Sequence, residues 1–268
     1  MATIKRMHLL CPIAPAPLAI LSALPQEQFG LIELLQGPRK VRHANRVFWL
    51  GELHSQPVVL ALSKIGKVAA ATTATVLIER FHVEGIVFTG VAGGLGIDVK
   101  VGDVVVASDF LQHDLDASPL FPRYEVPLYG KTRLPCDPGL STLLHEACCM
   151  ALDSGFFAGH GFHDARIHRG LIASGDRFVC GADESRRLLA LTAAAGHAVQ
   201  AVEMEGAAVA QVCMDYAVPF AVMRTISDRA DDSAHVDFPN FVETVASPYA
   251  QAIIQKFMGL LQNHNCQH

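Results

Sequence analysis

The stretch 85–107 reads GIVFTGVAGGLGIDVKVGDVVVA, in which two apolar runs flank a glycine-rich segment. The runs Gly85–Thr89 and Asp103–Ala107 have the length and the β-branched content of buried strands. We expect a loop over Gly90–Gly96 between them. This loop has neither the spacing of a dinucleotide-binding fingerprint nor the Gly-Lys-Ser/Thr of a P-loop, so its glycines alone are also compatible with a tight turn.

Outward from this stretch, apolar runs typical of strands alternate with segments that have the 3.6-residue apolar spacing of helices. The further expected strands are 18–21, 47–50, 57–62, 171–174, 198–202 and 220–225, and the expected helices are 26–36, 66–81, 142–152, 183–195, 205–216 and 249–261. Such alternation is typical of the α/β class. We predict one three-layer domain over residues 17–268, in which helices flank a central mixed, mainly parallel sheet.

The segment Met1–Ala16 precedes the first expected strand. Two basic residues followed by an apolar run are features of a signal peptide, but Pro12, Pro15 and Pro17 interrupt this run. We interpret residues 1–16 as an N-terminal extension. No window of the sequence has the ~18 uncharged apolar residues of a membrane span, so we expect a cytoplasmic protein without a membrane partner.

The 268 residues are 51% hydrophobic and 18% charged, with a formal net charge of −5. This composition can fill a sizeable core, which excludes a disordered chain, and its acidic balance gives no reason to expect a nucleic-acid partner. None of the seven cysteines forms a Cys-x-x-Cys pair, and none of the thirteen histidines forms a His-x-x-x-His pair on an expected helix. We therefore expect neither a metal site nor a cofactor.

Polar groups follow several of the expected strands at their carboxyl ends, where ligands bind in open α/β sheets. They are Glu27, the segment 174–179 (SGDRFV), Glu203-Met204-Glu205 and Ser227-Asp228. Acidic groups that gather at one edge of a sheet repel one another unless they stabilise a positive charge. The pattern therefore indicates a site in which positive charge develops.

Cleavage of the C–N bond of a nucleoside is a reaction of this kind, because its transition state resembles an oxocarbenium ion. One carboxyl group protonates the departing base, a second activates a water on the opposite face, and a third holds the ribose hydroxyls. Nearby carboxylates also stabilise the cationic sugar. The acids at the strand ends thus suit hydrolysis at an anomeric carbon.

Each of these residues also has a purely structural interpretation. Glu27 and Glu205 stand in the first turn of helices, where the helix dipole favours a carboxylate, and Asp228 suits an N-cap or a turn. Phe178 is of a type found mostly in the core. Glu203 is expected to have a structural role, because alternate residues of a strand point to opposite faces. Only the combination of these features favours a catalytic site.

Six short motifs occur in order between about Leu18 and Leu261. They are SKIGKVAA at 63–70, TGVAGG at 89–94, VGDVV at 101–105, SGDRF at 174–178, VEMEGA at 202–207 and RTISD at 224–228. In this combination the chain resembles the 5′-methylthioadenosine/S-adenosylhomocysteine nucleosidases of the purine nucleoside phosphorylase/uridine phosphorylase superfamily. The resemblance implies the nucleoside phosphorylase-like fold and hydrolysis of the N-glycosidic bond of these thionucleosides.

The resemblance also implies roles for single residues. Glu27 matches the carboxylate that activates the hydrolytic water, and Asp228 matches the acid that protonates the purine N7, oriented by Ser227. The other matching positions bind the substrate: Met204 and Glu205 the ribose, Phe178 and Val179 the purine, Arg224 near the water, and Gly93 in the loop that approaches the ligand. The family is typically a homodimer in which a neighbour's loop closes the thioalkyl end of the site, and the segment 111–138 is the expected loop here.

Several positions depart from the family's pattern. Val91 stands where the family often has a small hydroxyl residue, so the water is expected to lack one hydrogen bond. Lys64 replaces a usual glycine, and Arg177 replaces a usual small residue. The segment 117–131 has no close match, and we expect it to influence the preference for the 5′ substituent.

Three alternative functions remain open. A phosphorolytic relative needs a cationic or N–H-rich cradle for phosphate. The segments 22–27 and 89–92 contain no cation, and Glu27 would repel the anion, so hydrolysis is favoured. A second alternative is a binding protein without catalysis. The set of Glu27, Glu205 and Asp228 argues against it, because a protein that only binds a nucleoside does not need a general acid. A nucleosidase for another 6-amino nucleoside, such as aminofutalosine, is compatible with the same residues.

Overall fold

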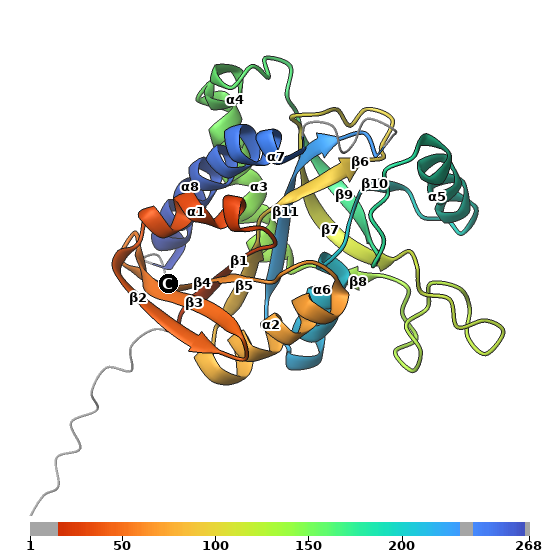
Figure 1. Cartoon of the computed structure of the whole chain (residues 1–268), viewed down its shortest axis with the longest axis horizontal. Coiled ribbons are helices and arrows are strands. Elements are labelled where there is room, and N and C mark those ends of the chain that lie inside the picture. The colour runs from red at the N-terminus through yellow and green to blue at the C-terminus, as the bar shows by residue number, and fades with distance from the viewer. Residues whose placement is uncertain (1–15, 231–237, 266–268) are drawn as a thin grey trace, which may run out of the picture.

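The computed structural model describes residues 16–230 and 238–265, and an eleven-stranded sheet runs through them (Figure 1). The strands are β1 (Leu18–Ser22), β2 (Gln36–His43), β3 (Arg46–Leu53), β4 (Gln56–Leu62), β5 (Gly85–Phe88), β6 (Val91–Gly94), β7 (Val104–Gln112), β8 (Leu134–Pro135), β9 (Ile167–Ser174), β10 (Val199–Glu203) and β11 (Phe220–Asp228). They are hydrogen-bonded in the order β2-β3-β4-β1-β5-β11-β6-β10-β9-β7-β8. Residues 1–15 of the expected N-terminal extension lie outside the described residues.

Helices cover both faces of the first half of the sheet (Figure 1). The helices are α1 (Pro25–Glu33), α2 (Lys67–Phe81), α3 (Pro138–Asp153), α4 (Phe156–Gly159), α5 (Ala182–Ala194), α6 (Gly206–Tyr216), α7 (Phe238–Phe241), the π-helix η1 (Val242–Ala246) and α8 (Ser247–Asn265). Alternate residues of β1 enter two core clusters. Ala19 and Leu21 pack with α2 and α6, whereas Leu18 and Ile20 pack with α1, α3 and α8. Within the described ranges, no helix is long and apolar enough to cross a bilayer.

The second half of the sheet closes into a ring of five strands, β11-β6-β10-β9-β7. The long strand β11 makes this closure possible. Its first residues, Phe220–Val222, pair with β5, Thr225–Asp228 pair with β6, and Met223–Thr225 pair with β7. The α/β class is confirmed, but the expected simple sheet between two helical layers is corrected to a sheet that curls into a ring.

The directions of the strands agree with the expected mixed, mainly parallel sheet. The parallel pairings join β4, β1, β5, β11 and β6 in that order, and they join β10, β9 and β7. Antiparallel pairings occur between β2 and β3, β3 and β4, β6 and β10, β7 and β11, and β7 and β8. The sheet is therefore mixed, and six of its eleven strand pairings are parallel, as expected.

Three strands lie where the sequence predicted none, namely β2, β6 and the two-residue β8. β6 occupies part of the expected glycine loop, and close packing explains its glycines. A Cβ on Gly93 would lie 2.9 Å from the Cβ of Ala230 and 3.0 Å from Oδ1 of Asp228. β2 is an almost wholly exposed edge strand that contains Gly37 and Pro38, which in the sequence are typical of a helix end.

Candidate active site

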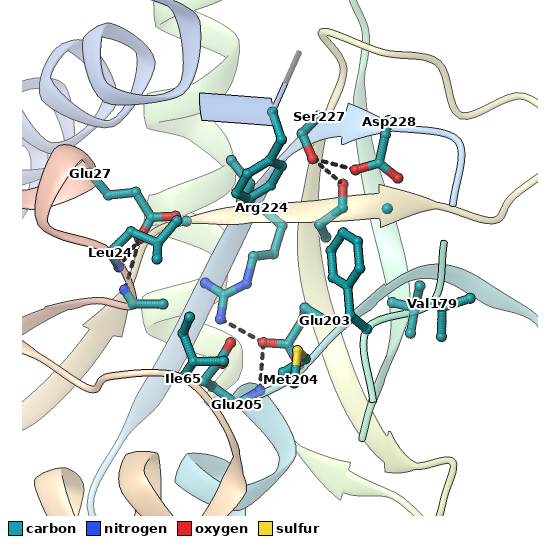
Figure 2. A pocket seen from close by; sticks show the side chains of 18 of the residues that line it. Leu24, Glu27, Ile65, Val179, Glu203, Met204, Glu205, Arg224, Ser227 and Asp228 are labelled. Carbon is teal, nitrogen blue, oxygen red and sulfur yellow. Dashed lines mark hydrogen bonds and ion pairs between the residues drawn. The ribbon is translucent and has the colours of Figure 1, made fainter. Parts of the chain in front are cut away.

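A cavity opens at the carboxyl ends of β1, β10 and β11 (Figure 2). The residues singled out in the sequence all line it, namely Glu27, Gly93, Phe178, Val179, Met204, Glu205, Arg224, Ser227 and Asp228. The lining also includes Leu24, Ile65, Gly90, Val91 and Glu203. The fold thus brings together segments that are far apart in the chain, as the sequence predicted.

Glu27 lies in the first turn of α1 and is 1% exposed. Its Oε2 accepts hydrogen bonds from the amides of Ala23 and Leu24, each at 2.8 Å. Its Oε1 is buried and has no hydrogen-bond partner among the described atoms. Burial raises the pKa of Glu27, although the Leu24 amide and the Arg224 guanidinium partly oppose this rise. The result is a rigidly held carboxyl group with one oxygen able to accept a proton.

Arg224 and Glu203 form a buried ion pair beside Glu27, with 2.7 Å between Nη2 of Arg224 and Oε2 of Glu203. The guanidinium lies 4.0 Å from the centre of the Phe88 ring. Glu203 also accepts hydrogen bonds from the amide of Gly206 and from the Ser174 hydroxyl. Glu203 therefore fixes Arg224 and the first turn of α6, in agreement with the structural role expected for it.

Glu205 precedes α6, and its Oε1 accepts a hydrogen bond of 2.9 Å from the amide of Gly66. Burial, together with the neighbouring charge of Glu203, raises the pKa of Glu205 to about 8, although the Gly66 amide and the Arg224 guanidinium oppose the rise. Two carboxyl groups so close together would repel each other if both were ionised. The surroundings of Glu205 therefore favour its neutral form in the free protein.

Asp228 ends β11 and is held from two sides. Its Oδ2 accepts a hydrogen bond of 2.7 Å from the Ser227 hydroxyl, and its Oδ1 accepts one of 2.7 Å from the amide of Ala230. Gly93 lies opposite Asp228 in the neighbouring strand and leaves room for this carboxyl group. Figure 2 shows Asp228 and Glu27 at opposite sides of the cavity, with Arg224 between them. Two acids thus face the cavity from different directions.

The segment before α5 supplies an apolar wall. Phe178 is 46% exposed, so the interpretation as a core residue is wrong. Its ring meets that of Phe238 edge-on, with 6.3 Å between the ring centres. Val179 is buried against the same cavity, and Met204 is half-buried on the adjoining side. This wall can bind a planar, apolar group such as a purine.

The structure shows where the three departures from the family's pattern lie. Lys64 adopts a φ of 62°, in the left-handed region that favours the glycine for which it stands. Val91 lines the cavity, but its side chain has no group that can hydrogen-bond. Arg177 also lines the cavity, and its Nε lies 2.7 Å from Oε1 of Glu184. Among the residues that the structure describes, no cluster of histidine, cysteine and acidic side chains could hold a metal ion.

The chain matches known proteins over most of its length. The profile of the Phosphorylase superfamily matches residues 17–258. The 5′-methylthioadenosine/S-adenosylhomocysteine nucleosidase of Chromohalobacter salexigens is 35% identical over 240 residues, which is 88% of this chain and 94% of that protein. The aminodeoxyfutalosine nucleosidase of Campylobacter jejuni is 33% identical over 242 residues, 89% of this chain and 96% of that protein.

A solved structure shows the same fold. The methylthioadenosine/adenosylhomocysteine nucleosidase of Neisseria meningitidis, bound to methylthio-immucillin-A, superposes with a TM-score of 0.79 at 33% identity, over 91% of this chain and 99% of that one. These matches, together with the cavity that the predicted residues line, establish the family of this chain. The chain belongs to the phosphorylase superfamily, in the nucleosidase family that includes the methylthioadenosine/adenosylhomocysteine enzymes.

Proposed function

We propose that this protein hydrolyses the N-glycosidic bond of 5′-methylthioadenosine or S-adenosylhomocysteine and releases adenine and the thioribose. The convergence of Glu27, Glu205 and Asp228 on one cavity carries the proposal. The names of the matched relatives support it, because most of them act on these two thionucleosides.

Glu27 is the proposed general base. Its free Oε1 can take a proton from a water, while the two backbone amides on Oε2 keep the carboxyl group in place. A raised pKa strengthens a carboxylate as a base, since the best catalytic pKa lies near the working pH. Arg224 would lie near this water, and the side chain of Val91 would give it no hydrogen bond.

Asp228 is the proposed general acid. A protonated carboxyl group at the end of β11 would donate to the purine N7 and so turn adenine into a good leaving group. Ser227 holds Oδ2 and thereby orients the group. The position of Asp228 across the cavity from Glu27 suits this division of roles, because the base leaves on one face of the sugar and water attacks on the other.

The remaining predicted residues would bind the substrate. We propose that Glu205 and Met204 hold the ribose, with Glu205 accepting hydrogen bonds from its 2′ and 3′ hydroxyls. Phe178 and Val179 would bind the purine, and Gly93 would allow the backbone of β6 to approach the ligand. A sugar that becomes cationic above Glu205 is stabilised by the carboxylate form of that residue.

The charges of the cavity favour water over phosphate as the acceptor. Two described cations line the cavity, and each is paired with an acid: Arg224 with Glu203, and Arg177 with Glu184. Phosphate would therefore meet Glu27 without a free cation to offset the repulsion. Hydrolysis is the reaction that this arrangement suits.

A second candidate substrate is an aminodeoxyfutalosine. The Campylobacter jejuni relative of that name matches this chain as well as the thionucleosidases do, and a futalosine hydrolase from Helicobacter pylori superposes with a TM-score of 0.79 at 32% identity. The same catalytic acids would cleave this nucleoside, because it has the same adenine and ribose groups as the thionucleosides.

We further propose that residues 17–268 form one domain and that the protein is a cytoplasmic homodimer without nucleic-acid or membrane partners and without a cofactor. The segment 111–138 would reach the neighbour's site. It exposes Leu120 and Leu128, at 84% and 90%, and Val68 at the start of α2 is 80% exposed. Large apolar side chains of this kind are often covered by a partner. Sedimentation equilibrium would measure the assembly.

The test of the activity is adenine release, followed by absorbance, from methylthioadenosine, adenosylhomocysteine, deoxyadenosine, inosine and aminofutalosine, each with and without phosphate. We expect turnover of one or both thionucleosides at a rate that is independent of phosphate. Product formation that requires phosphate would contradict hydrolysis. Absence of turnover with every nucleoside, while the protein still binds them, would indicate a binding protein.

A further inference from the structure

A second pocket lies beside the active-site cavity, and we call it the basic pocket. Its lining includes Gln28, Arg42, His43, Asn45, Arg46 and Lys64. The described residues of the lining thus contribute three permanent positive charges and no carboxylate. This balance is unusual in a protein with a formal net charge of −5, and it suits an anionic ligand.

The charges of this pocket are not used within the fold. In the described part of the chain, neither Arg42 nor Lys64 forms an ion pair. Arg46 donates only to neutral acceptors, namely the Thr73 hydroxyl and two carbonyl oxygens. These bonds fix the guanidinium beside α2 without neutralising it.

A buried donor in the same pocket also lacks a partner. Gln28 is 5% exposed, and its Nε2 makes no hydrogen bond with any described atom. A buried amide group that is left unpaired costs free energy, so its retention calls for an acceptor. The charges and the amide thus point independently to a ligand rich in oxygen.

The topology places the basic pocket at the same edge of the sheet as the active site. β3 runs antiparallel to β4, with Phe48 opposite Ala61, so the turn between β2 and β3 lies at the carboxyl end of β4. β4 is the direct neighbour of β1, whose carboxyl end borders the active-site cavity. Neighbouring strands are about 4.8 Å apart. Lys64 of the basic pocket is followed directly by Ile65 of the cavity.

The proposed orientation of the substrate directs its 5′ end toward this side. Figure 2 shows Ile65 and Leu24 at the side of the cavity away from Asp228 and Val179. With the purine at Asp228 and the ribose at Glu205, the 5′ substituent leaves toward Ile65. A substituent a few bonds longer than methylthio would then continue toward Lys64.

We propose that the basic pocket binds a carboxylate at the end of a long 5′ substituent, and this inference rests on the proposed function. Because the pocket offers no described acid, it repels an ammonium group. Adenosylhomocysteine carries both an ammonium and a carboxylate on its tail. The preferred class of substrate is therefore an adenine nucleoside whose 5′ substituent ends in a carboxylate without an ammonium.

Two synthetic nucleosides of equal chain length test this preference: 5′-(4-carboxybutylthio)-5′-deoxyadenosine and 5′-pentylthio-5′-deoxyadenosine. At low salt we expect kcat/KM for the carboxylate compound to exceed that for the pentyl compound about tenfold, the effect of two partly exposed charges. Adenosylhomocysteine should lie between them. Added NaCl should reduce the difference, since it screens exposed charges.

The double variant Lys64→Gln/Arg42→Gln should bring the ratio close to one and leave kcat/KM for methylthioadenosine unchanged. The matched control Arg39→Gln/Arg80→Gln removes the same charge outside the pocket and should keep the preference. Thermal melting checks that each variant folds. The inference would be overturned by equal kcat/KM for the two compounds in the wild type. It would also be overturned if the double variant lost as much kcat/KM on methylthioadenosine as on the carboxylate compound. Either result would leave the proposed function intact. Absence of adenine release from every thionucleoside in the wild type would instead refute the proposed function.

Discussion

Replacing Glu27 with glutamine isolates the proposed base, because the substitution removes a charge and keeps the shape. The carbonyl oxygen of glutamine can accept the two hydrogen bonds of 2.8 Å that the amides of Ala23 and Leu24 donate to Oε2. The amide nitrogen then takes the place of Oε1, which has no partner among the described atoms. The first turn of α1 should therefore remain as it is.

The expected loss of rate follows from the role of a general base, which contributes about 10²- to 10⁴-fold. We expect kcat for methylthioadenosine to fall by about this factor and KM to stay within about threefold, because the base does not contribute to ground-state binding. The stability should not fall. Burial raises the pKa of Glu27 above its value in the unfolded chain, so its contribution is greatest below the unfolded pKa and is lost as the pH rises through the folded pKa.

Glutamine stays neutral at every pH, so the Tm of the variant at pH 8 should equal or exceed that of the wild type. Adenine release and calorimetric melting measure the two effects on the same preparation. The matched control is Glu33→Gln, which removes an exposed carboxylate of the same helix and should leave both quantities unchanged. A Glu27→Gln enzyme with more than a third of the wild-type kcat would show that another group activates the water.

Three further predictions concern the other groups of the cavity. Asp228→Asn should abolish adenine release but keep methylthioadenosine binding, measured by calorimetry, within a few-fold; wild-type turnover would exclude Asp228 as the acid. Because the pKa of Glu205 is raised to about 8, its contribution to stability is present below its unfolded pKa and lost as the pH rises through about 8. Melts from pH 5 to 9 should therefore show a smaller loss of Tm in Glu205→Gln than in the wild type, and identical slopes would contradict the raised pKa. Gly93→Ala would place a Cβ 3.0 Å from Oδ1 of Asp228 and should lower kcat about tenfold or more, the cost of a misplaced catalytic group. Gly159→Ala, whose Cβ would meet nothing within 4 Å, is the control, and equal rates in the two variants would remove Gly93 from the site.

The sequence predicted the elements of the fold better than their arrangement. Apolar runs such as 57–62 and 220–225 became β4 and β11 because burial on both faces leaves a clear pattern. β2 has an exposed, polar sequence with a glycine and a proline, so no apolar pattern marks it as a strand. The ring depends on which edge of β11 each neighbour takes, and this property of the pairing leaves no periodic signal.

The site could be predicted in its residues but not in its interactions. The position of the acidic residues after predicted strands indicated a site, and the resemblance to the nucleosidase family implied the role of each residue. Without it, Phe178 is a core residue by its type, and only its 46% exposure in the structure corrects that reading. The ion pair between Glu203 and Arg224 joins β10 and β11, which follow one another in the chain but are separated by β6 in the sheet. No spacing within either motif predicts this ion pair.

Burial and pairing together set the charge of the cavity. Of the four carboxyl groups that line it, Glu203 is paired with Arg224, and burial raises the pKa of Glu27 and of Glu205. The free site near neutral pH thus carries less negative charge than its composition suggests, which limits repulsion between the acids. In the proposed reaction a sugar that turns cationic favours the ionised form of Glu205, whereas Glu27 must be ionised before it takes a proton from the water. Because these groups are shielded from water, each such charge acts at a low effective dielectric. The burial that makes ionised Glu27 and Glu205 unfavourable for folding is therefore the same property that makes them effective partners for the transition state.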